Sequence, residues 1–140
     1  MSFREKSAWI SLLAYLAIYG FYFTRVAGAL ARGNADGIPF LGLFAQSVVL
    51  FVLVTIVFTV IAAVAAPKDA QAPQDEREKL IALKAHSASG YVLATGVLFV
   101  IGVLFYGARD FAVINLLFFA LVLSEVFRIV VQIALYRRGA

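Results

Sequence analysis

The sequence predicts an all-α membrane protein: one bundle over residues 1–140, with four transmembrane helices in two hairpins and both termini in the cytoplasm. Three observations predict this fold class. Hydrophobic residues make up 64% of the chain and the mean hydropathy is +0.96, whereas soluble domains are roughly 45–50% apolar. Four apolar stretches approach or exceed the about 20 residues that a helix needs to cross about 30 Å of hydrocarbon. Lysine and arginine are unevenly distributed between the loops, and this asymmetry sets the orientation.

The predicted spans cover residues 7–30, 39–66, 85–106 and 111–136. The first span is too long for the core of a secretory signal, and Arg25 lies where a cleavage region would be, so we expect this helix to be retained. The second span begins after a glycine-rich turn, with Pro39 at its start. The short connections on the far side of the membrane leave no domain there to bind a soluble ligand.

Residues 67–84 form the predicted cytoplasmic linker between the hairpins. Residues 67–74 have the polar, proline-flanked composition of a flexible linker. Asp75, followed three residues later by Glu78, predicts a helix N-cap and its reciprocal partner, and Asp75 with Lys79 forms a favourable i, i+4 pair. We therefore expect a helix to begin near Asp75 and to continue into the third span.

The basic residues outside the spans predict the orientation. Those on the side of the termini are Arg4, Lys6, Lys68, Arg77, Lys79, Lys84, Arg137 and Arg138. Arg32 and Arg109 lie on the other side. Because positive residues accumulate in cytoplasmic loops, the termini and the linker are expected in the cytoplasm, and the protein in the inner membrane as a multi-pass protein.

The composition argues against several functional classes. The absence of cysteine excludes disulfides and thiolate metal sites. A single histidine, His86, does not form a bis-histidine haem site, and we expect no metal and no cofactor. The basic residues are explained by topology, so nucleic acid is not an expected partner. His86, Ser87 and Ser89 are the only interfacial polar group available to a lipid enzyme, and they lack an oxyanion-hole motif; we expect no catalytic residue and no enzyme.

The charged residues inside the spans are the strongest functional candidates, because a charge in hydrocarbon requires a partner, water or a function. Glu125, Arg128 and Gln132 share one face of the fourth helix, and Glu125 lies about 16 Å from Tyr136, near the midplane. Polar residues at similar depths on the other helices are Tyr15, Tyr19, Thr55 and Thr95. One interpretation is an internal ion pair that locks the bundle. The other is a coupling site, at which Glu125 exchanges a proton or a cation.

A second polar layer is predicted near the outer face, formed by Arg25, Gln46 and Asn115. Arg25 reaches the outer interface by extending along its helix, which makes it an anchor. A lipid headgroup or an anionic ligand is the alternative partner for this arginine.

The cytoplasmic segment carries one further signal. Asp75-Glu76-Arg77, then Ile81, then Lys84-Ala85 resembles the signature of small prokaryotic four-helix membrane proteins of unknown function. In that group the signature lies in a cytoplasmic loop before a later spanning helix. The resemblance implies the same architecture and a regulatory or partner-binding loop, and it implies no catalytic residue.

These observations predict a non-enzymatic inner-membrane protein that acts through partner or self-association. Its expected partners are the lipid bilayer and either further copies of the chain or another membrane protein. The predicted contact segment consists of Asp75, Glu76, Arg77, Glu78, Lys79 and Lys84. The alternative is a small oligomeric proton- or cation-coupled transporter or channel subunit that uses Glu125.

Overall fold

The computed structural model describes residues 3–33, 39–108 and 110–138, apart from the side chains of residues 69 and 70. These residues form α1 (Phe3–Ala14), the π-helix η1 (Tyr15–Tyr19), α2 (Gly20–Ala31), α3 (Phe40–Ala65), α4 (Pro67–Gln71), α5 (Glu76–Phe105) and α6 (Asp110–Arg138). The segments α1, η1 and α2 run on as one helix, Phe3–Ala31. The described part of the chain thus contains four helices long and apolar enough to cross a membrane, which confirms the predicted all-α class and its four spans. Arg109 and most of the predicted glycine-rich turn lie outside the described residues.

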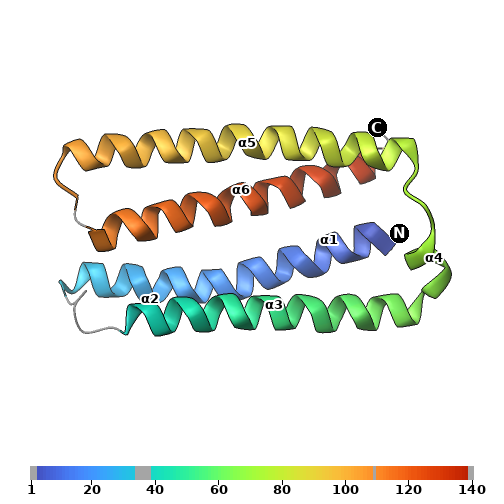
Figure 1. Ribbon diagram of the computed structural model, residues 1–140, viewed down its shortest axis with the longest axis horizontal. Coiled ribbons are helices and arrows are strands. Elements are labelled where there is room, and N and C mark those ends of the chain that lie inside the picture. The colour runs from blue at the N-terminus through green and yellow to red at the C-terminus, as the bar shows by residue number, and fades with distance from the viewer. Residues whose placement is uncertain (1–2, 34–38, 109, 139–140) are drawn as a thin grey trace.

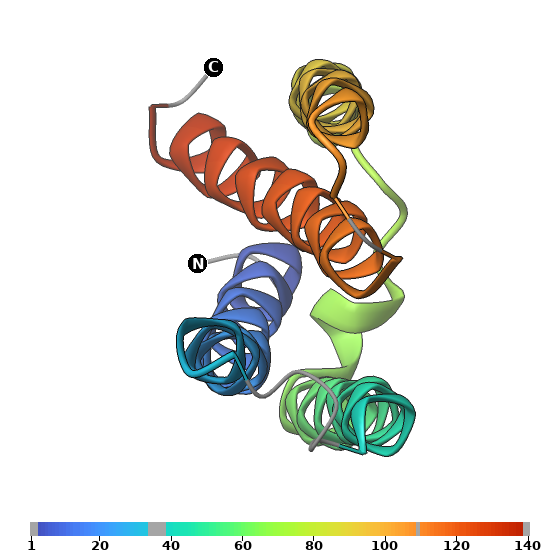
Figure 2. The same cartoon turned by 90° about the vertical axis from the view of Figure 1, so that its left-hand side faces the viewer.

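The four long helices lie side by side (Figure 1). Both chain ends and the short helix α4 lie at one end of the bundle, here called the termini end, and the connections from α2 to α3 and from α5 to α6 lie at the other, the loop end. Seen from the loop end, α6 lies between α5 and α1, while α3 and α5 are on opposite sides (Figure 2). The helix α6 therefore provides most of the packing between α5 and the rest of the bundle.

The start of α5 shows which local signals in the linker hold. The Asp75 side chain caps the helix, accepting a 2.7 Å hydrogen bond from the backbone N–H of Glu76. The predicted reciprocal partner is wrong, because Glu78 forms an ion pair with Arg4 of α1 at 3.0 Å. The predicted pairing of Asp75 with Lys79 is also wrong, since Lys79 binds Glu76 at 2.7 Å. A full positive charge nearby attracts a carboxylate more strongly than a backbone N–H does.

The connections contain one helix that was not predicted and two glycines in the left-handed conformation. The linker contains α4, with Pro67 in its first turn, where proline's fixed φ favours a helix start. Gly33 follows α2 with φ +64, and Gly107 follows α5 with φ +82. Glycine adopts these left-handed values without a steric penalty, which is why each helix ends there.

The packing is closest between α5 and α6. A Cβ atom placed on Gly96 would lie 2.6 Å from the Cβ of Ala120, so the two backbones approach each other at this glycine. The contact between α1 and α6 is a cluster of buried aliphatic side chains, made up of Ala8, Leu12, Ile129 and Ile133, with Trp9, Tyr15 and Val126 against it. By contrast, Ser47 is the only buried residue of α3. Its exposed apolar surface is compatible with contact with a lipid bilayer.

The first spanning helix is interrupted by the π-helical turn η1 at Tyr15–Tyr19. A π-turn places one extra residue in the helix and shifts the faces on either side of it relative to one another. Neither proline nor glycine occurs within this turn, so the sequence gives no simple signal for it. Tyr19 of this turn is buried, and Tyr15 is half-buried and lies near Arg128 and Gln132 of α6.

Candidate functional site

Glu125 and Arg128, the two charged residues in the middle of α6, form an ion pair. Arg128 donates from Nε and from Nη2 to the same carboxylate oxygen of Glu125, Oε2, at 2.9 and 2.8 Å. The two residues lie one turn apart on α6, so the pair needs no other helix to form. Their side chains remain 32% and 30% exposed, which means that protein atoms do not seal the pair.

A polar cavity of about 440 Å³ reaches this pair from the termini end. It is bounded by α1, η1, α3, α6 and the linker, and its lining is Phe3, Arg4, Ser7, Ala8, Ser11, Tyr15, Phe51, Gln74, Arg128, Ile129, Gln132 and Tyr136. Arg128 is part of the lining, whereas Glu125, one turn closer to the loop end, is not. The distance along α6 from Tyr136 to Arg128 is about 12 Å at 1.5 Å per residue, so the cavity penetrates deep into the spanning region.

Arg4 closes part of the termini end of the cavity. Its Nε binds Glu78 of α5 at 3.0 Å, and its Nη2 donates to the carbonyl oxygen of Ala72 at 3.2 Å. These contacts connect α1 to the linker and to α5. Arg77 of α5 in turn donates to the carbonyl oxygen of Tyr136 at 3.4 Å, which links α5 to the end of α6.

Aromatic side chains close the cavity toward the loop end. The Tyr15 ring lies 4.3 Å from that of Phe51, and the Tyr19 ring lies 5.3 Å from Phe51 and 5.4 Å from Phe118, measured between ring centroids. Further rings continue this packing as far as the contact between Phe40 and Phe111, whose centroids are 5.0 Å apart. Tyr15 and Phe51 are the members of this aromatic packing that belong to the cavity lining, so the described lining ends there.

The charge of the lining decides what the cavity can hold. Two arginines, Arg4 and Arg128, line it, and the described lining contains no acidic residue. Hydroxyl and amide groups of Ser7, Ser11, Tyr15, Gln74, Gln132 and Tyr136 add neutral hydrogen-bond donors. The carboxylates that pair with the two arginines, those of Glu78 and Glu125, belong to residues outside the lining. Such a cavity can bind an anion through charge-assisted hydrogen bonds.

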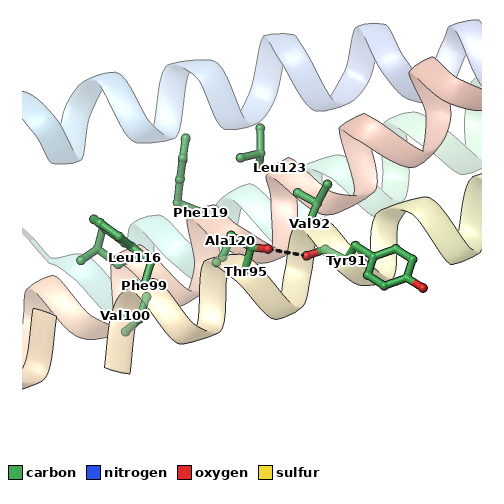
Figure 3. A pocket seen from close by; sticks show the side chains of 10 residues that line it. Tyr91, Val92, Thr95, Phe99, Val100, Leu116, Phe119, Ala120 and Leu123 are labelled. Atoms are coloured by element: carbon green, nitrogen blue, oxygen red, sulfur yellow. Dashed lines mark hydrogen bonds between the residues drawn. The ribbon is translucent and has the colours of Figure 1, made fainter. Parts of the chain in front are cut away.

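The predicted inner polar layer is only partly brought together. Tyr15 and Gln132 line the cavity, and Tyr19 belongs to its aromatic floor. The hydroxyl oxygen of Thr55 is buried without a hydrogen-bond partner in the described part of the chain. Thr95 is exposed, donates to the carbonyl oxygen of Tyr91 at 2.8 Å, and lies in a separate apolar groove between α5 and α6 (Figure 3). Counting residues along the helix predicted a depth for Thr95 but not the face of α5 on which it lies.

The predicted outer layer does not form one cluster. Asn115 is buried and accepts a 2.9 Å hydrogen bond from the Tyr22 hydroxyl. Arg25 is exposed, with its guanidinium 5.1 Å from the centroid of the Phe21 ring, and it has no ion pair with a described residue. Gln46 is exposed and borders a different cavity, of about 260 Å³, between the first spanning helix and α3.

The predicted contact segment is largely engaged within the chain. Asp75 caps α5, Glu78 binds Arg4, and Arg77 donates to the end of α6. The Glu76–Lys79 pair is exposed, and so is Lys84. Of these six described residues, Lys84 is therefore the one that can present its charge to an external partner without first breaking a contact described above.

The sequence prediction included Tyr15 but missed Arg4 and Ser7, which belong to the same wall of the cavity. Arg4, Ser7, Ser11 and Tyr15 are spaced by three, four and four positions, which is one face of an α-helix. That polar stripe was a usable signal. Phe51 and Gln74 gave none, because their role depends on how α3 and the linker are placed.

Comparison of the chain with protein-family models, with curated proteins and with solved structures finds no match. No group of three or more metal-ligating residues occurs among the residues that the structure describes. The function is therefore argued from the cavity and from the ion pair at its inner end.

Proposed function

We propose that the protein is a non-enzymatic, multi-pass membrane protein that binds a small anion in the cavity between α1 and α6. The observation that supports this proposal is the lining: two arginines, several neutral donors and no acidic residue. Its volume, about 440 Å³, falls within the roughly 300–1,000 Å³ of small-molecule sites. Arg128 is the anion ligand at the inner end, and Glu125 holds its guanidinium in place.

The cavity accounts for an otherwise unfavourable feature of α6. An arginine in the middle of a spanning helix costs about 2.5–3.5 kcal/mol even on insertion scales, and its pairing with Glu125 offsets part of this. An ion pair that served only as a lock would be most stable in a dry contact. Here Arg128 instead lines a polar cavity that extends to Arg4 and Tyr136 at the termini end.

A cysteine-accessibility experiment tests the proposal without requiring the natural ligand. The chain contains no native cysteine, so a single Ser11→Cys change places one thiol on the cavity wall. The probes are two methanethiosulfonates of similar size, one carrying a sulfonate and the other a trimethylammonium group. We compare the rate of reaction with the anionic reagent to the rate with the cationic one. This ratio should be about fivefold or more higher for the cavity thiol than for a free thiol, because a unit charge at about 4 Å is worth at least about 1 kcal/mol.

Two controls make this test specific. Leu13→Cys, two positions away on the same helix and 62% exposed on its outer surface, should react slowly with both reagents in a bilayer. Arg128→Gln in the Ser11→Cys background should remove the anion preference, whereas Arg138→Gln, outside the cavity lining, should retain it. An unreactive thiol at position 11, or a preference that survives Arg128→Gln, contradicts the proposal.

We also propose that the termini end faces the cytoplasm of an inner membrane and that the helices form two hairpins. The eight basic residues expected at that end, against two at the other, support this orientation. The same impermeant reagents test it, since the Ser11→Cys thiol should react in inside-out vesicles and stay protected in right-side-out vesicles. Labelling in right-side-out vesicles, with protection in inside-out vesicles, would mean the reverse orientation.

A second candidate function is an oligomeric proton- or cation-coupled transporter subunit that uses Glu125. The π-turn at Tyr15–Tyr19 favours it, because π-turns within helices are frequent at functional sites and this one forms the cavity floor. Transport would require the aromatic floor to open. Glu125→Gln should then abolish flux in reconstituted vesicles while the helical content stays unchanged; preserved flux would contradict this candidate.

Association through the segment from Asp75 to Lys84 has narrower support, since Lys84 and the exposed Glu76–Lys79 pair are the charges for which no contact with another helix is described above. If this segment captures a partner protein or a second copy, replacing Lys79 and Lys84 with glutamine should weaken co-purification and leave membrane insertion unchanged. Unchanged co-purification would count against this role.

A further inference from the structure

A second basic site lies between α5 and α6 at the termini end, separate from the polar cavity. It is a hollow of about 210 Å³ lined by Arg77, Leu80, Ile81, Lys84 and Leu135. Two cationic side chains border three aliphatic ones, and the described lining contains no acid. The combination differs from that of the polar cavity, whose hydrophilic lining suits a solute in water.

The acidic residues nearest in sequence to Lys84 are engaged in other contacts. Asp75 caps α5, Glu76 binds Lys79, and Glu78 binds Arg4. Lys84 has no ion pair with a described residue. Arg77 donates to the carbonyl oxygen of Tyr136 at 3.4 Å, and this bond holds its side chain across the hollow toward α6. Lys84 therefore brings to the site a positive charge that has no ion pair in the described part of the chain, and Arg77 is held beside it.

The position of the site along the helix corresponds to the edge of the hydrocarbon. The uncharged stretch of α5 from Ala85 to Phe105 is about 32 Å long at 1.5 Å per residue, close to the about 30 Å thickness of a bilayer core. Lys84 is the residue just before that stretch, and Arg77 lies two turns further out. This is the level at which lipid phosphates lie.

We propose that this hollow binds the headgroup phosphate of an anionic glycerophospholipid, with Lys84 and Arg77 as the phosphate ligands. The aliphatic lining and the exposed Leu80 and Leu83, 56% and 67% exposed, border the path of its acyl chains. A soluble anion gains nothing from these leucines. A zwitterionic lipid would bring an ammonium group to a site that offers it no carboxylate, so the site favours a lipid of net negative charge. Basic pockets between spanning helices bind such headgroups in other membrane proteins.

Native mass spectrometry of the full chain in detergent tests the proposal, with phosphatidylglycerol and phosphatidylcholine of identical acyl chains as the probes. The protein should retain phosphatidylglycerol preferentially. Lys84→Gln should weaken that retention about fivefold, the effect of one cationic contact near a membrane surface. Lys84→Arg should restore it. The matched control is Lys68→Gln, which removes an exposed lysine of α4 at the same end of the bundle but outside the hollow.

Three outcomes would overturn the proposal. Equal loss in the Lys84→Gln and Lys68→Gln variants would mean that only overall charge matters. Equal retention of the two lipids would remove the headgroup preference. Displacement of phosphatidylglycerol by inorganic phosphate at millimolar concentration would assign the site to a soluble anion. Circular dichroism of each variant checks that the exposed substitutions leave the helices intact, and the Lys84→Arg variant separates charge from folding.

Discussion

The contact between Gly96 and Ala120 provides the sharpest test of how α5 and α6 are held together. In a Gly96→Ala variant the new Cβ would lie 2.6 Å from the Cβ of Ala120, whereas apolar carbons pack at about 3.5–4.0 Å. The helices must therefore separate by about 1 Å at this point. Overpacking of this kind costs about 1–3 kcal/mol, and the better helix propensity of alanine returns at most about 1 kcal/mol. We expect a net loss of about 1–2 kcal/mol of unfolding free energy.

Two partner variants isolate the steric cause of that loss. Gly102→Ala changes the same residue type on the same helix, but its Cβ would meet nothing within 4 Å. That variant should be unchanged or slightly more stable. Adding Ala120→Gly to Gly96→Ala removes the obstructing methyl group and leaves the Cα of residue 120 at 3.5 Å, an ordinary contact. The double variant should recover most of the lost stability.

Unfolding can be followed by energy transfer between dyes on cysteines introduced at two exposed positions, Ser87 of α5 and Ala134 of α6. The absence of native cysteine makes this labelling unambiguous. The variants are compared by their midpoints in a denaturing-detergent titration. If Gly96→Ala is as stable as Gly102→Ala, or if Ala120→Gly fails to restore it, the close approach of α5 and α6 does not carry the packing energy.

Three further predictions use the same unfolding measurement or hydrogen exchange. Tyr22→Phe leaves the buried Oδ1 of Asn115 without its donor and should cost about 1 kcal/mol; no change would mean that water replaces the hydroxyl. Asp75→Ala removes the cap of α5 and should speed amide exchange in its first turn, an effect of about 1 kcal/mol, without affecting exchange in α3. Ile129→Ala empties the α1–α6 contact and should cost about 2–4 kcal/mol, clearly more than Val130→Ala on the exposed face of α6.

The fold class could be predicted because each span carries its own signal. A stretch such as residues 39–66 is apolar throughout, and no other part of the chain has to be known to predict its helix. The cap at Asp75 was likewise local and was predicted correctly. The expected role of Glu78 as the reciprocal partner of Asp75 was wrong, because Arg4, more than seventy positions away, attracts Glu78 once α1 and α5 are packed. Local signals identified elements, while the competition among distant charges depended on tertiary structure.

For the candidate site, the sequence did not predict which face of each helix a residue lies on. Tyr15 and Thr95 were placed at the same general level of the membrane, yet Tyr15 lines the polar cavity and Thr95 faces an apolar groove on the outside of α5 and α6. The level of a residue follows from counting positions along its helix. The face on which it lies within the bundle depends on how that helix is rotated about its axis. The π-turn at Tyr15–Tyr19 adds a further rotation that a regular helical period does not contain.

The placement of Glu125 relative to Arg128 distinguishes a lock from a binding site. Arg128 lines the cavity, and Glu125 binds its guanidinium from the side toward the loop end, where the aromatic floor begins. An entering anion thus meets the arginine first and competes with Glu125 for the same donors. A pair used only to hold the bundle would gain nothing from this arrangement, because access by water weakens its electrostatic attraction. A pair used for binding requires it, since the ligand must reach one charge while the other keeps that charge in position.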